Sequence, residues 1–382
     1  MKKLIRITTV PISLLILLRS QLCFMADYYE IVAVSSGGPA LKQVAKETGV
    51  RTVEIDMTRE ITPFKDLKAL WTLYLMMKRE KPHVVHTHTP KAGLLGMIAS
   101  KLAGVPVRLH TVAGMPLLEK KGLIRKILDV VEKLTYSCAT KVYPNSALMR
   151  QIIIKNRYCS PGKLKVIGNG SSNGIDTKFF DPDNIDLHKS TFSLRKSLNI
   201  NSQDIVYCFV GRIVADKGIN ELVEAFDAIA HHNKKVKLLL LGNFETQLDP
   251  LKPKTEELIS NHPDIIWVDF QMDVRPYFAV SDIFVFPSYR EGFPNVVMQS
   301  GAMGLPCIVT DINGCNEIII NGQNGIIVPP KDALKLQDAM EQLVNDDTLR
   351  LELASRSRAL ILSRYDQQFV WNELLKEYQL FN

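Results

Sequence analysis

The most constraining feature of this 382-residue chain is a twice-repeated alternation of short apolar runs with longer amphipathic segments. Runs such as 29–35, 83–88 and 204–210 have the length and apolar content of buried strands, and the segments between them have helical spacing. This alternation predicts parallel sheets that are covered by helices on both faces. We therefore expect an α/β protein of two doubly wound, Rossmann-like domains that face each other across a cleft.

The division between the two domains is expected in a polar stretch, GNGSSNGIDTKFFDPDNIDLHKS, at residues 168–190. Gly, Asn, Ser and Asp are typical of linkers, and a chain of this length favours two domains. We predict an N-terminal domain over 1–168, a linker over 169–190 and a C-terminal domain over 191–365. A final helix over 366–382 is expected to cross back to the first domain.

Charge is distributed unequally between the halves. Residues 1–180 contain 28 Lys and Arg against 12 Asp and Glu, a net of +16, whereas residues 181–382 contain 19 against 28, a net of −9. A basic half indicates an anionic partner, either nucleic acid or an anionic membrane surface. No aromatic-plus-basic RNA-binding signature or zinc-finger spacing is visible, so we expect a membrane surface and no nucleic acid.

One basic amphipathic stretch, 117–133, is the candidate membrane contact, although an ordinary surface helix has the same pattern. Its candidate residues are Lys120, Lys121, Arg125 and Lys126. No apolar run approaches the ~20 residues that span a bilayer, so no transmembrane helix is expected. The N-terminal apolar run at 12–18 resembles a signal peptide, but Pro11 precedes it and no small-residue cleavage site follows; a strand and a helix are the better interpretation.

The six cysteines include no Cys-x-x-Cys pair, and most lie in or beside apolar runs. We interpret them as reduced core residues and expect neither disulfides nor a zinc site. A chain that is 46% apolar and 23% charged can form large cores and is not a disordered polymer.

A βαβ unit in the second half contains the first candidate site. The apolar run 282–287 is followed by the turn Ser288-Tyr289-Arg290-Glu291-Gly292, a helix from Asn295 and a second apolar run at 306–310. A helix that begins at the carboxyl end of a parallel strand is suited to binding an anion. Glu291 in the turn and Gln299 in the helix can border one ligand there. An ordinary capped helix in an α/β domain fits the same local pattern.

A second candidate follows the strand at 204–210, in the segment Gly211-Arg212-Ile213-Val214-Ala215-Asp216-Lys217-Gly218. Gly211 allows a ligand to approach the backbone, and two cations follow just before a helix. Arg212 can hold two oxygens of a diphosphate as a fork, and Lys217 can act as a point charge. The alternative is a pair of solvated surface cations.

Together these segments resemble the retaining GT-B glycosyltransferases of family four. The resemblance rests on Gly211-Arg212 with Lys217-Gly218, on Glu291-Gly292-Phe293-Pro294-Asn295, on Asn173-Gly174-Ile175-Asp176, and on His110-Thr111 after a first-domain strand. These motifs extend over nearly the whole chain in the expected order. Bacterial enzymes that extend lipid-linked saccharides for capsule, O-antigen or glycoprotein glycans are the most similar in kind.

The resemblance implies roles for particular residues. Arg212 and Lys217 would neutralise the donor diphosphate, Glu291 would hydrogen-bond the transferred sugar, and His110 would approach that sugar. Gln299 occupies the position of the family glutamate that contacts the ribose, a departure that removes a charge. The implied catalytic residues are His110, Glu291, Arg212 and Lys217. The implied donor-binding residues are Gly211, Arg212, Lys217, Glu291, Phe293, Asn295, Val296 and Gln299.

The acceptor is expected on the first domain. His88, Thr89 and Lys91 place an imidazole, a hydroxyl and a cation at a helix start, which suits an acceptor phosphate. His86 and His88 could instead be metal ligands, but no carboxylate or thiol accompanies them. The resemblance implies a nucleotide-sugar donor, with UDP favoured, and a polyprenyl-diphosphate-linked saccharide acceptor.

No cofactor or metal is expected. Asp181-Pro182-Asp183 has the spacing of a metal-binding aspartate pair, but it lies in the predicted linker, where a polar turn is the better interpretation. The predicted reaction is transfer of a hexose or N-acetylhexosamine with retention, by front-face attack, at the cytoplasmic face of the cell membrane. The alternatives are a GT-B nucleotide-sugar epimerase, a phosphorylase, for which the chain is short, and a non-catalytic protein that binds sugar nucleotides or polyanions.

Overall fold

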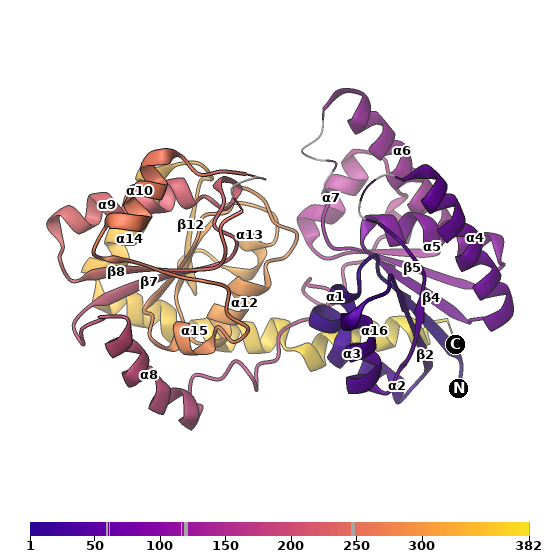
Figure 1. Cartoon of the computed structure of the whole chain (residues 1–382), viewed down its shortest axis with the longest axis horizontal. Coiled ribbons are helices and arrows are strands. Elements are labelled where there is room, and N and C mark those ends of the chain that lie inside the picture. The colour runs from indigo at the N-terminus through magenta and orange to yellow at the C-terminus, as the bar shows by residue number, and fades with distance from the viewer. Residues whose placement is uncertain (59, 61, 116, 118–120, 246–248, 382) are drawn as a thin grey trace. The chain divides into compact units, whose positions relative to one another are not determined.

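The computed structural model describes residues 1–381 except 59, 61, 116, 118–120 and 246–248, and for residues 185–190 the backbone alone. The chain divides into two compact units (Figure 1). Unit 1 comprises Met1–Gly174 and Gln367–Asn382, and unit 2 comprises Ile175–Asp366. Each unit has its own parallel sheet and core, and each is described separately.

Unit 1 contains a six-stranded sheet in the order β3-β2-β1-β4-β5-β6, with every pair parallel. Its strands are β1 (Lys3–Ile7), β2 (Glu30–Ser35), β3 (Arg51–Glu54), β4 (Val84–His88), β5 (Val107–Val112) and β6 (Lys141–Pro144). Its helical segments are α1 (Pro11–Ser13), η1 (Leu14–Leu18), α2 (Arg19–Ala26), α3 (Pro39–Thr48), α4 (Pro63–Glu80), α5 (Pro90–Leu102), α6 (Gly122–Cys138), α7 (Ala147–Lys155), η3 (Pro161–Lys163) and α16 (Gln367–Gln379).

The helices of unit 1 form a layer on each face of the sheet, and each layer buries its own apolar core. The first layer is α4, α5, α6 and α7, with α5 between α4 and α6. The second comprises η1, α2, α3 and α16. Central strands are buried on both faces, which explains their near-continuous apolar sequences.

Unit 2 repeats this architecture with a sheet in the order β12-β11-β10-β7-β8-β9, again parallel throughout. Its strands are β7 (Ile205–Val210), β8 (Val236–Leu241), β9 (Ile265–Val268), β10 (Ile283–Phe286), β11 (Cys307–Thr310) and β12 (Gly325–Val328). Its helices are α8 (Ile185–Ser197), η4 (Ala215–Lys217), α9 (Ile219–His232), α10 (Pro253–Asn261), α11 (Arg275–Ala279), α12 (Asn295–Ala302), α13 (Cys315–Ile318), α14 (Ala333–Asn345) and α15 (Asp347–Tyr365).

The two sheets share one strand order when the strands of unit 2 are counted from β7. In such sheets the strand order reverses between the first and fourth strands, and ligands bind beyond the carboxyl ends of those strands. The reversal lies between β1 and β4 in unit 1 and between β7 and β10 in unit 2. The predicted α/β fold with two doubly wound domains is confirmed.

The polar segment between the sheets is less extended than the sequence suggested. Residues 185–190, which we assigned to the linker, form the first turns of α8. This run, IDLHKS, contains neither Gly nor Pro, so nothing in it interrupts a helix. Asp181 forms an ion pair with Arg358 at 3.1 Å and accepts the N–H of Asp183, so these two aspartates belong to a turn.

Candidate active site

The candidate donor-binding residues of unit 2 lie beyond the carboxyl ends of β7 and β10, which are neighbours in the sheet. The turn after β7 contains Lys217, and the turn after β10 contains Glu291. Gly218 explains how closely the turns approach, because its φ is +72° and a Cβ there would lie 2.1 Å from the carbonyl oxygen of Pro287. Only glycine fits without moving one turn away from the other.

Lys217 and Glu291 form a direct ion pair. Both side chains are largely buried, with 14% and 17% of their surfaces exposed. Ser288 donates its hydroxyl to the same Glu291 carboxylate oxygen at 3.0 Å, and Asn313 donates to the Glu291 backbone carbonyl at 3.2 Å. The carboxylate is therefore held in one position by a cation and a hydroxyl.

Arg212 is the second cation of this site and is half-exposed. It forms an ion pair with Glu245 at 2.7 Å and approaches Asp216 at 4.0 Å. Its pKa is raised above the ordinary value by the hydrogen bond to Glu245 first, with contributions from Asp216 and Glu291. Asp216, which Arg212 approaches, immediately precedes Lys217 in η4, so Arg212 lies beside the turn that contains Lys217.

Asp216 and Arg290 tie the two turns together, a feature that the sequence reasoning missed. The Arg290 guanidinium donates to the Asp216 carboxylate at 2.6 Å, and the N–H of Tyr289 donates to the Asp216 carbonyl at 2.9 Å. The Tyr289 hydroxyl also donates to Glu221 at 2.6 Å. Asp216 and Arg290 each immediately precede a predicted site residue in the sequence. That adjacency is the only sequence signal of their role.

The start of α12 supplies backbone N–H groups beside these side chains, since the first turn of a helix leaves such donors without intrahelical acceptors. Asn295, Val296 and Gln299 are half-buried in α12. The Phe293 ring is partly buried and packs edge-on against Tyr365, with ring centroids 5.4 Å apart, so its side chain packs against the core.

In unit 1, His110 lies on β5 and is almost fully buried. Its Nδ1 is 2.8 Å from the Thr87 hydroxyl, and its ring lies against α5, where a Cβ on Gly93 would be 2.4 Å from His110 Cε1. Burial lowers the pKa of His110 to about 4. The imidazole is therefore neutral near pH 7 and can form hydrogen bonds without adding charge.

The predicted acceptor residues extend from the last residue of β4, His88, into the start of α5 and are already engaged within unit 1. His88 stacks on His86 with ring centroids 4.4 Å apart, and the hydroxyls of Thr89 and Thr9 are 2.7 Å apart. Lys91 contacts both carboxylate oxygens of Asp66 at 2.7 Å. Lys91, the predicted acceptor-binding cation, is thus ion-paired within unit 1.

Arg6 is a second feature that sequence reasoning did not single out. Its guanidinium is fully buried and donates to Tyr378 at 2.9 Å, to Gln21 at 2.5 Å and to His88 at 2.9 Å. Tyr378 lies on α16, and its hydroxyl is also 2.6 Å from His86 Nδ1. Burial first, then Arg6, lowers the pKa of His88 well below its ordinary value. This network attaches α16 to the sheet of unit 1.

Comparison with known proteins identifies the family. The model for glycosyl transferases group 1 matches residues 190–360, and that for a glycosyl transferase 4-like domain matches residues 23–170. The capsular polysaccharide biosynthesis glycosyltransferase CapM of Staphylococcus aureus is 34% identical over 96% of this chain and 94% of its own. The chain belongs to this glycosyltransferase family.

Other relatives and structures agree with this assignment. A galactosyltransferase of Escherichia coli, named for transfer from UDP-Gal to GlcNAc-diphosphoundecaprenol, is 30% identical over 81% of each chain. Among solved structures, Anabaena Alr3699/HepE in complex with UDP aligns with a TM-score of 0.81 at 17% identity over the whole of both chains. A Rickettsia africae glycosyltransferase aligns with a TM-score of 0.80 at 20% identity over 100% of this chain and 98% of its own. The glycosyltransferase therefore has the GT-B fold, as predicted.

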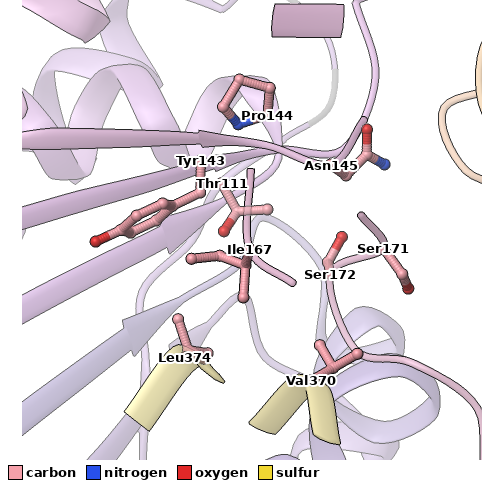
Figure 2. Close-up of a pocket in the computed structure, with 9 residues that line it drawn as sticks. All are labelled: Thr111, Tyr143, Pro144, Asn145, Ile167, Ser171, Ser172, Val370 and Leu374. Atoms are coloured by element: carbon pink, nitrogen blue, oxygen red, sulfur yellow. The ribbon is translucent and has the colours of Figure 1, made fainter. Parts of the chain in front are cut away.

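A small pocket of the glycosyltransferase lies at the carboxyl ends of β5 and β6 (Figure 2). It is bordered by Thr111, Asn145, Ser171 and Ser172, and the side chains of Val370 and Leu374 on α16 close one side. The accessible volume of the pocket is only about 10 Å³, which is room for roughly one water molecule. A sugar does not fit there, and the pocket is not an acceptor site.

The predicted membrane contact falls mainly on α6. Lys121 and Lys126 are exposed, whereas Arg125 forms an ion pair with Asp129 at 2.8 Å and donates to Tyr158 at 2.9 Å. Lys120 lies outside the described residues. Arg125 therefore stabilises its own unit, and the two lysines are available to a partner. Among the residues that the structure describes, no helix is both long and apolar enough to cross a membrane.

Proposed function

We propose that this glycosyltransferase moves a hexose or N-acetylhexosamine, with retention, from a nucleoside diphosphate sugar to a polyprenyl-diphosphate-linked saccharide in surface polysaccharide biosynthesis. The supporting observation is the group of Lys217, Glu291 and Arg212 beyond the ends of β7 and β10. The capsule-related name of the Staphylococcus aureus relative and the undecaprenol-linked acceptor in the name of the Escherichia coli relative support the pathway and the acceptor. UDP is the donor nucleotide that we favour.

Charge provides the catalysis in this proposal. Breaking the bond between the sugar C1 and its phosphate oxygen leaves a nucleoside diphosphate with developing negative charge. Arg212 and Lys217 neutralise that charge, assisted by N–H groups at the start of α12. Each charge-assisted hydrogen bond contributes roughly 1.5–3 kcal/mol, so two cations supply several factors of ten in rate. We propose that these two cations do the work that a divalent metal does in other transferases.

The ion pair of Lys217 with Glu291 suggests how the free protein keeps its site ordered. Without donor, the ammonium satisfies the carboxylate. When a donor binds, its β-phosphate competes with Glu291 for the Lys217 ammonium. The Glu291 carboxylate then accepts hydrogen bonds from the sugar hydroxyls. Ser288 holds the carboxylate during this exchange, because it donates to the same oxygen.

Retention follows from front-face attack. The acceptor hydroxyl forms the new bond to C1 on the face that the phosphate leaves, and its proton passes to the departing phosphate oxygen. No carboxylate nucleophile is needed in this sequence. His110 serves as a neutral hydrogen-bonding group for the sugars, consistent with its lowered pKa. The side-chain amide of Gln299 hydrogen-bonds the ribose hydroxyls of the donor.

We place the acceptor on unit 1, at the start of α5, where His88 is the last residue of β4 and Thr89 follows it. Lys91 is paired with Asp66, so we propose that Lys91 holds the start of α5 in place beside the acceptor. Peripheral attachment at the cytoplasmic face of the membrane, through Lys121 just before α6 and Lys126 on α6, would bring the enzyme to a lipid-linked acceptor.

The test is acceptor-dependent turnover. Candidate nucleotide sugars are incubated with and without a polyprenyl-diphosphate saccharide, and nucleoside diphosphate release and the lipid product are measured. The proposal predicts that release requires the acceptor and that the lipid product gains one sugar in the donor's anomeric configuration. Epimerisation without acceptor, or no turnover with a broad panel of donors and acceptors, would overturn it.

A further inference from the structure

The outward face of α4 in unit 1 is apolar, although no fold requirement explains it. Phe64, Leu67, Trp71 and Leu75 are spaced three or four residues apart, so they form one stripe along the helix. Phe64 is 91% exposed and Trp71 60%. The opposite face of α4, which includes Leu73, is buried against the core. An exposed stripe of this kind marks an interaction surface.

A second stripe of the same kind runs along α6. Its members, Leu123, Ile124, Ile127, Val130 and Leu134, are all exposed. Both α4 and α6 pack against α5 in the same helical layer (Figure 1), and α5 itself is largely buried between them. One layer of unit 1 therefore presents two apolar stripes, which we call the α4/α6 face.

Lysines accompany both stripes. Lys68 and Lys78 lie within a turn of the apolar residues on α4, and Lys126 and Lys133 do so on α6; all four are exposed. Lysines beside apolar residues can extend their ammonium groups to headgroups while the apolar side chains enter the acyl boundary. Tryptophan, here Trp71, favours that same boundary.

We propose that the α4/α6 face docks on an anionic lipid bilayer, with the α4 stripe inserted at the headgroup–acyl boundary. The net charge of +16 over residues 1–180 is complementary to such a surface. A two-fold contact with a second copy would instead bring like-charged lysine rows together. This inference extends the proposed membrane contact from the lysines of α6 to the apolar stripe of α4. It rests on the proposed function only for the reason to bind a bilayer, which is that a lipid-linked acceptor resides there.

The test uses vesicles of three parts phosphatidylcholine to one part phosphatidylglycerol, with and without brominated acyl chains. A Trp267→Phe variant leaves Trp71 as the exposed indole, because Trp371 is buried. We expect both kinds of vesicle to shift Trp71 emission to shorter wavelength, because the indole leaves water, and brominated lipid to quench that emission. Absence of quenching at saturating vesicle concentration would overturn the proposal.

A matched pair of double variants separates this surface from general hydrophobicity. Leu67→Ser with Leu75→Ser removes two exposed leucines of α4, and Leu334→Ser with Leu351→Ser removes two exposed leucines of unit 2. We expect the first pair to weaken vesicle partitioning roughly tenfold or more and the second to leave it unchanged. Equal losses would overturn the proposal. The proposal would also be overturned if the parent did not bind vesicles but formed a dimer in light scattering, and the first double variant did not form that dimer.

The failure of this inference can be distinguished from failure of the proposed function. With a short-chain acceptor that is soluble without vesicles, the Leu67→Ser, Leu75→Ser variant is expected to turn over at the parent rate. A lowered rate with that acceptor would indicate a structural or catalytic role for α4 and contradict the docking role. If the parent shows no turnover with any acceptor, the proposed function fails, while vesicle quenching still tests the surface.

Discussion

Replacing Lys217 by methionine tests the proposed role of this cation with a control that the fold provides. The ammonium forms an ion pair with Glu291 in a partly buried site and, in the proposal, moves to the donor diphosphate. Methionine keeps the length of the side chain and removes the charge. One charge-assisted contact in the transition state contributes roughly 1.5–3 kcal/mol. At about 1.4 kcal/mol per factor of ten, kcat/KM for the donor should fall about ten- to a hundredfold or slightly more.

The control is Lys237→Met. Lys237 pairs with Asp264 at 2.6 Å, and these side chains are 13% and 16% exposed, closely matching Lys217 and Glu291. Lys237 lies near the start of β8, at the opposite end of the strand from the carboxyl edge. Its loss should lower thermal stability about as much as loss of Lys217 does and leave kcat/KM within about twofold.

The assay measures initial rates of acceptor-dependent nucleoside diphosphate release across donor concentrations, with thermal unfolding of each variant measured in parallel. Lys217→Arg retains a cation and should recover part of the lost rate. A fall of less than about threefold for Lys217→Met, or equal falls for Lys217→Met and Lys237→Met, would refute the assignment of Lys217 to the leaving group.

Three further predictions concern the turns and the buried histidine. Asp216→Asn and Arg290→Gln should each lower kcat/KM, because each breaks the ion pair that joins the two turns. The double variant should have a kcat/KM no lower than that of the less active single variant, because both changes break the same contact. Multiplicative effects in this double-mutant cycle would contradict the coupling. Gly218→Ala should reduce both thermal stability and donor turnover, because the added methyl meets the Pro287 carbonyl at a φ of +72°; unchanged unfolding and kinetics would contradict the close contact. The folded pKa of His110 is about 4 against 6.5 ordinarily, so between these values the unfolded chain binds more protons at this residue than the folded chain does. His110 alone should therefore lower the free energy of unfolding by about 3 kcal/mol as pH falls from 6.5 to 4. Denaturant unfolding of His110→Gln should show a correspondingly flatter pH dependence; an identical slope would contradict it.

Sequence reasoning predicted that the candidate donor-binding residues lie close together, because the topology of the sheet brings the turns that contain them together. In a parallel sheet of this strand order, the turns after β7 and β10 are neighbours, so residues 74 positions apart, Lys217 and Glu291, form an ion pair. Strand and helix alternation was sufficient to predict that arrangement. The family resemblance supplied the roles of these residues, which the pattern of apolar residues alone does not contain.

The parts that sequence reasoning missed depend on which side chain meets which partner. The pairing of Lys91 with Asp66 joins two helices, and the brace between Asp216 and Arg290 joins two turns. Neither pairing leaves a periodic signal in the sequence. Arg6 was overlooked because a single arginine in the strand KLIRI reads as an edge residue, whereas its partners come from α2, β4 and α16.

The expected linker shows a related difficulty. Its polar composition suggested an irregular segment up to residue 190, but helix formation depends on the absence of Gly and Pro within a run as much as on its polarity. Helix α8 therefore begins at Ile185, inside the predicted linker.

The most direct test of the central claim is calorimetric binding of UDP, with ADP and GDP in parallel, to the parent and to the Arg212→Met, Lys217→Met double variant. The account predicts that one nucleoside diphosphate binds the parent and that the double variant binds it at least about a hundredfold less tightly, while the double variant, although less stable than the parent, still unfolds in one cooperative transition. Equal affinity of the two proteins for that diphosphate would contradict the claim that these cations hold the leaving group.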